Sequence, residues 1–183
     1  MTWRTGEETA TDVGRLCAVS RRLHEVLGIS SLVARGPALV VALDELSLQH
    51  AWHAELLFEQ LPLRAGYDRE AAVQLGGVAS PLDLLASLGA AGDDVGLLAG
   101  YARVIVPRVT LSLEVVSQGT TEVAERSLRR ATRLICSDLA AAEPLVEQLA
   151  EGMIAASGAA EHAVFVVGDL EGVLGARTGV LGD

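Results

Sequence analysis

The sequence is poor in aromatic residues and in cysteine. Only 3% of its 183 residues are Phe, Trp or Tyr, and only two are cysteines. Alanine and leucine dominate instead, a composition that favours close-packed helices over sheets. Cys17 and Cys136 lie far apart in apolar helical patterns, which excludes a disulfide scaffold and indicates reduced core residues. We therefore expect one all-α fold in the cytoplasm.

Basic residues are also in the minority. The chain carries 14 basic and 24 acidic side chains, a formal net charge of −10. Such a charge repels phosphate backbones, so we expect no nucleic-acid partner. The one basic cluster consists of Arg126, Arg129, Arg130 and Arg133. Glu122 and Glu125 precede it at favourable i,i+4 spacing, which predicts a solvated helix face or the rim of a partner site.

Long hydrophobic runs and several familiar motifs are missing. No stretch of about 18 uncharged apolar residues is present to span a bilayer, and the opening MTWRTGEETATD lacks the apolar centre of a signal peptide. The chain also has no glycine-rich phosphate loop with lysine, no serine nucleophile elbow and no paired-cysteine metal motif. We therefore expect no membrane association, no nucleotide binding by a phosphate loop, no serine hydrolase activity and no metal site built from paired cysteines.

Helical periodicity predicts four long helices. The first is expected over residues 11–34 with Thr11 or Asp12 as its cap, the second over 37–60 and the third over 93–117 with a kink at Pro107. The fourth is expected to begin at Thr121 and to bend at Pro144. Residues 63–92 are expected to form a long crossover with short helices near 69–74 and 80–88.

The glycine-rich end of the chain differs from the rest. Residues 1–157 are expected to form the helical bundle, and residues 158–183 a tail that is either flexible or docked on the bundle or a neighbour. Within it, residues 163–167 are of strand-forming types, yet a single strand would have no partner. We expect His162, in this tail, to be solvated.

The second helix places two histidines on its buried stripe. His50 and His53 fill the steps between Leu46 and Leu57 in LVVALDELSLQHAWHAELLFEQL. On the fourth helix, the stripe that includes Leu128 and Ile135 puts Asp138 in a core position. A buried carboxylate needs a partner, so we expect a histidine, Arg108 or a metal beside it.

Two helical hairpins joined by a long crossover, with inward polar residues, resemble the ferritin-like four-helix bundle. The phrases HAWHAELLFEQLP and LAGYARVIVPRV resemble a ferritin-like group common in high-GC Gram-positive bacteria. The resemblance covers roughly residues 10–152. It implies two metals held by glutamates and two Glu-x-x-His motifs. Here His50 replaces the expected glutamate, Ala141 the expected histidine and Tyr101 another glutamate, which indicates a degenerate dinuclear site.

Several interpretations follow from this resemblance. The remaining candidate metal ligands are His50, His53, Asp138 and either His24 or Glu25. Tyr101 is then a hydrogen-bond donor, and Arg108 shares its stripe in a polar core network. The favoured hypothesis is a bundle without metal that binds a small ligand or a protein partner, with a homodimer as the expected assembly. The alternative is an oxidoreductase or hydroxylase with non-haem iron or another transition metal on two histidines and a carboxylate.

Overall fold

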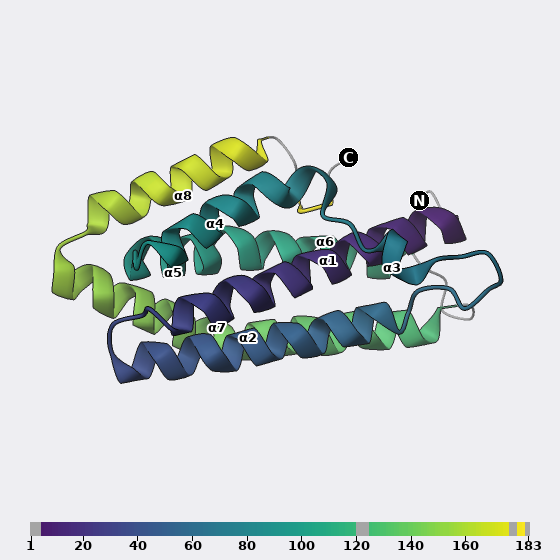
Figure 1. The fold of residues 1–183 in the computed structure, drawn as a ribbon, viewed down its shortest axis with the longest axis horizontal. Helices are drawn as coiled ribbons and strands as arrows, with labels where there is room; N and C mark the ends of the chain where they lie inside the picture. The colour runs from purple at the N-terminus through teal and green to yellow at the C-terminus, as the bar shows by residue number, and fades with distance from the viewer. Residues whose placement is uncertain (1–4, 120–124, 176–178, 182–183) are drawn as a thin grey trace.

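The computed structural model describes residues 5–119, 125–175 and 179–181. Every regular element in these ranges is a helix, so the all-α prediction is confirmed. Four long helical members form the centre: α1 (Gly6–Ser31), α2 (Pro37–Phe58), the continuous α5 (Asp94–Gly100), η2 (Tyr101–Ile105) and α6 (Val106–Gly119), and α7 (Arg126–Ser157). Figure 1 shows α4 and α8 on one side of this bundle and α2 with α7 on the other.

α1 and α2 form a closely packed helical hairpin. α1 begins at Gly6 because Thr5 caps it: the Thr5 hydroxyl accepts the backbone N–H of Glu8, and the Glu8 carboxylate accepts the backbone N–H of Thr5. The predicted start at Thr11 or Asp12 is therefore wrong, since this capping box lies nearly two turns earlier. Gly36, with a φ of 111°, turns the chain into α2, which starts on Pro37 as predicted.

The third long helix contains a π-helical turn at η2. The backbone N–H of Val106 bonds the carbonyl of Tyr101, five residues back, instead of the usual four. Pro107 follows directly, and its ring has no N–H and would clash with the carbonyl of Arg103 in a regular helix. The irregularity expected at Pro107 thus takes the form of a π turn that begins at Tyr101.

α7 packs against α2, α5 and α6 and is described from Arg126 onward. The predicted start at Thr121 lies outside the described residues. The helix continues through Pro144 to Ser157. The connection between α2 and α5 contains α3 (Arg69–Ala72), η1 (Gly76–Val78) and α4 (Ala79–Ala90), close to the short helices expected there, and α4 packs on α1.

The end of the chain is mostly helical. α8 (Ala160–Leu174) packs on α4 and α5, so the strand-forming residue types at 163–167 lie in a helix. The contact is close, because a Cβ added to Gly100 would run into the side chain of Leu170. His162 is exposed, as expected, and it also pairs with Asp93 at 2.6 Å from Nε2 to Oδ2. Further on, the backbone N–H of Val180 donates to Ser112.

One helix in the described part of the chain, residues 94–119, is long and apolar enough to cross a membrane by length and composition alone. Buried core helices pass the same test, and 61% of its most apolar window is buried inside the bundle.

Candidate functional site

His50 and Tyr101 form a fully buried polar pair. Both are 1% exposed, and His50 Nε2 lies 2.8 Å from the Tyr101 hydroxyl. The π turn at Tyr101 is a type of irregularity that often marks functional sites. Burial lowers the pKa of His50 to about 3, with the neighbouring His53 and His24 adding to the effect, and burial raises the pKa of Tyr101 well above its usual range. Both groups are therefore neutral at pH 7.

His53 forms a second pair that reaches the surface. Its side chain is fully buried, and its Nε2 lies 3.2 Å from Oδ2 of Asp138, whose side chain is 39% exposed. Burial lowers the pKa of His53, although the Asp138 carboxylate opposes the shift. The prediction that Asp138 occupies a core position is wrong, because the adjacent Leu139 turns into the core and Asp138 lies at the edge of α7. Its partner is a histidine, one of the three kinds of partner that were expected beside it.

The remaining ring nitrogens have no hydrogen-bond partner among the described residues. They are Nδ1 of His50 and Nδ1 of His53. A carboxylate only accepts, so Asp138 holds the proton of neutral His53 on Nε2 and leaves Nδ1 as a bare acceptor. The two rings lie 5.6 Å apart, edge to face. Buried imidazole nitrogens of this kind are normally satisfied by water or a ligand.

The other candidate residues form hydrogen bonds and ion pairs outside this network. His24 Nδ1 is 2.8 Å from the Ser47 hydroxyl, which itself donates to the His24 carbonyl. Glu25 pairs with Arg22 at 3.1 Å on the exposed side of α1. The first helix therefore contributes neither predicted ligand to the His53 and Asp138 pair.

Arg108 also lies away from the histidines. Although it follows Tyr101 by two turns, its guanidinium pairs with Glu171 of α8. The prediction that it belongs to the polar core network of Tyr101 is thus corrected. The tail residues that form α8 supply its partner, and the sequence pattern of the bundle alone gave no sign of them.

The donor set does not fit the dinuclear centre that the resemblance implies. Within the described residues, no group of three or more His, Cys, Asp or Glu side chains is placed to hold a metal ion. Ala141 stands where a histidine ligand is expected, and Tyr101 binds His50 through its hydroxyl. Bridging carboxylates for two divalent ions are accordingly missing from the described site.

A surface groove lies between α2 and α7, next to Asp138. Its volume is about 350 Å³, within the range of small-molecule sites. Its lining consists of Ala42, Glu45, Leu46, Gln49, Asp138, Ala141, Ala142 and Leu145. Glu45 and Gln49 were not singled out from the sequence. Glu45 lies five residues before His50 and Gln49 four residues before His53 on the same helix, and this spacing was the only available signal.

Comparisons with known proteins give no relative from which a role could be transferred. No family model, no curated protein and no solved structure matches this chain.

Proposed function

We propose that this protein is a small-ligand-binding bundle of ferritin-like architecture without a working dinuclear centre. The observation that carries the proposal is the position of Asp138. This carboxylate lines the groove between α2 and α7 and at the same time bonds the fully buried His53. A ligand that engages Asp138 therefore acts directly on the hydrogen bond that holds the buried histidine.

The arrangement of helices supports the ferritin-like part of this proposal. α1 packs with α2, and α6 packs with α7, so the long helices are paired as two hairpins. The connection between them runs from the end of α2 to the start of α5 and includes α3 and α4. A long crossover between the second and third helices is typical of the ferritin-like class.

The groove chemistry selects a cation with an apolar body. Two of its lining side chains, Glu45 and Asp138, are carboxylates, and Gln49 adds an amide. Leu46 and Leu145 supply apolar surface beside them. A protonated amine can form charge-assisted hydrogen bonds to the carboxylates while its hydrocarbon part covers the leucines, whereas an anion would be repelled.

A direct test uses the phenylethylammonium ion as probe. We expect calorimetric titration at pH 7 to show 1:1 binding to the full chain, and Asp138→Asn to weaken it about tenfold by removing one charge-assisted hydrogen bond. Asp169→Asn is the matched control, because Asp169 is an exposed aspartate on α8 and should change the affinity less than twofold. Equal weakening by the two variants would exclude the groove.

A mononuclear metal oxidoreductase is the second candidate. It is favoured by the unpartnered Nδ1 atoms of His50 and His53 and by the bond from His53 to Asp138, because metal-bound histidines commonly donate their other N–H to a carboxylate. This candidate predicts about one iron, manganese or zinc per chain in protein purified without a metal column. It also predicts that His53→Ala removes the metal while helicity survives. Unchanged metal content in that variant would count against it.

We further propose that the bundle associates as a homodimer through the outer face of α2. Val41, Leu48 and Trp52 share that face and are 56%, 62% and 56% exposed. Two copies related by a twofold axis could cover this apolar stripe mutually. Light scattering should give the dimer mass for the parent chain and the monomer mass for Leu48→Glu; a monomeric parent chain would contradict this assembly.

A further inference from the structure

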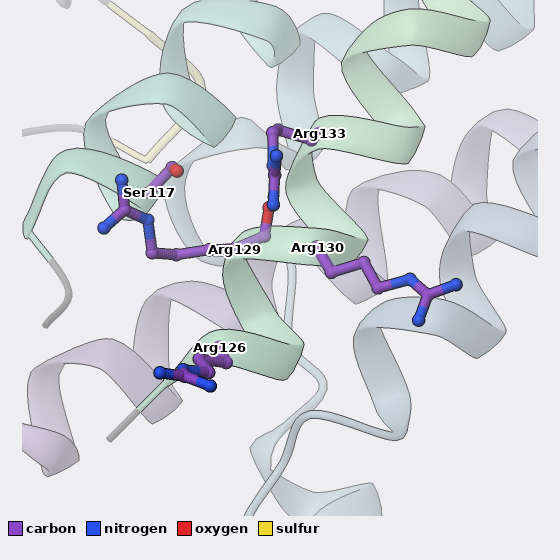
Figure 2. Close-up of a pocket in the computed structure, with 5 residues that line it drawn as sticks. All are labelled: Ser117, Arg126, Arg129, Arg130 and Arg133. Atoms are coloured by element: carbon purple, nitrogen blue, oxygen red, sulfur yellow. The ribbon is translucent and has the colours of Figure 1, made fainter. Parts of the chain in front are cut away.

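A second cavity lies at the start of α7, away from the histidines. It has a volume of about 450 Å³ and is lined by Ser117 of α6 and by Arg126, Arg129, Arg130 and Arg133 of α7. We call it the arginine pocket. Figure 2 shows the Arg129 side chain extending toward Ser117, with Arg133 beside it and Arg130 reaching to the opposite side.

The pocket concentrates positive charge in an acidic protein. Its four arginines follow the spacing i, i+3, i+4 and i+7, so they share one face of a helix. Like charges at such spacing repel one another by a few tenths of a kcal/mol per pair. Among the described residues, Arg130 and Arg133 form no ion pair, and the contact found for Arg133 is its Nε donating to the Arg129 carbonyl at 3.3 Å. Arg126 and Arg129 already have partners, so Arg130 and Arg133 are the guanidinium groups that an anion in the pocket would neutralise.

We propose that the arginine pocket binds a small molecule that carries two or more phosphate groups. Guanidinium groups form paired hydrogen bonds to phosphate oxygens, which suits the arginine lining of the pocket. Seven residues of helix separate Arg126 from Arg133, a rise of roughly 10 Å. That length suits several linked phosphates better than one, and the volume suits a small molecule.

The overall charge favours a short ligand over nucleic acid. The net charge of −10 opposes the approach of a long chain of phosphates that extends beyond the pocket. A small polyphosphate ligand stays within the pocket and avoids this repulsion. The pocket is also separate from the groove at Asp138, so this site and the proposed amine site can each fail without the other.

Inorganic triphosphate is the probe for this site. We expect calorimetric titration of the full chain in 50 mM salt to give binding at least tenfold tighter than for orthophosphate, and the affinity to fall as salt rises. Arg133→Gln should weaken triphosphate binding about tenfold. The matched control is Arg35→Gln, which removes the same charge from the turn between α1 and α2, at the opposite end of the bundle from the start of α7 (Figure 1), and should change the affinity less than twofold.

Circular dichroism of both variants checks that α7 remains folded. Three results would overturn the proposal: no binding of triphosphate to the parent chain, equal weakening by Arg133→Gln and Arg35→Gln, or tighter binding of a 20-base-pair DNA duplex than of triphosphate under the same conditions. The last result would reassign the pocket to nucleic acid.

Discussion

His50 and His53 lie three residues apart on α2 and face the same interior, yet their partners differ. His50 bonds Tyr101, which is 1% exposed. His53 bonds Asp138, whose side chain is 39% exposed and lines a groove. One pair is closed within the core, and the other joins the core to the surface. The first pair is thus placed to hold the bundle together, and the second to respond to a ligand.

The largest expected difference between the two pairs is in stability. Tyr101→Ala removes a buried ring and leaves a cavity beside His50, so we expect it to lower the free energy of unfolding by about 3–5 kcal/mol. Asp138→Ala leaves Nε2 of buried His53 without its partner but opens no cavity in the core, and should cost about 1–2 kcal/mol. Urea unfolding followed by circular dichroism measures both, and similar losses for the two variants would contradict the comparison.

The next effect is a pH dependence of the free energy of unfolding that comes from His50, which is buried beside Tyr101. Folding lowers the pKa of His50 from about 6.5 in the unfolded chain to about 3. Between these two values the unfolded chain binds a proton that the folded protein does not, so the free energy of unfolding is highest above pH 6.5 and falls as the pH drops toward 3. By pH 5 the loss should reach about 2 kcal/mol. The double variant His50→Leu/Tyr101→Phe lacks this titration and should lose correspondingly less between pH 7 and 5. If the free energy of unfolding falls equally with pH in the parent chain and in the double variant, His50 is not the group that causes the loss.

Removing only the hydroxyl of Tyr101 isolates the hydrogen bond. Tyr101→Phe leaves Nε2 of His50 buried without a partner, and we expect the free energy of unfolding to fall by about 1 to 2 kcal/mol. Tyr67→Phe is the control, because Tyr67 is only partly buried and should change by less than about 0.5 kcal/mol. If the two substitutions have the same effect, the bond to His50 does not stabilise the fold.

The smallest effect on stability is expected at the pair formed by His53 and Asp138. Asp138→Asn keeps the side-chain shape and a hydrogen-bond acceptor for His53, so thermal unfolding should show a change of less than about 1 kcal/mol. A larger loss would mean that the carboxylate serves the core and not the groove.

The sequence predicted the helices better than it predicted the site. Apolar periodicity was enough to find α2 and the buried positions of His50 and His53, because a stripe of leucines fixes which face is inward. The resemblance, and not the periodicity, predicted Tyr101 as a hydrogen-bond donor, and its hydroxyl lies 2.8 Å from Nε2 of His50. The start of α1 was missed because Thr5 and Glu8 form a capping box outside the periodic segment.

The exposure of Asp138 and the docking of α8 could not be predicted from local sequence patterns. An amphipathic helix turns about 100° per residue, so a small error in its orientation exchanges a core position for an edge position, as happened between Asp138 and Leu139. The docking of α8 depends on long-range contacts such as that between Gly100 and Leu170. No local pattern encodes these contacts, and the pairing of Arg108 with Glu171 depends on the same docking.

Asp138 connects the groove to buried His53, and nitrogen NMR of the histidine rings tests most directly whether a ligand acts through this connection. In the parent chain at pH 7, titration with phenylethylammonium should shift the ring signals of His53 in a saturable way and leave those of His162 unchanged. Asp138→Asn should abolish the His53 shift. An unmoved His53 signal in the parent chain, or the same shift in Asp138→Asn, would show that a ligand in the groove does not act on His53 through Asp138.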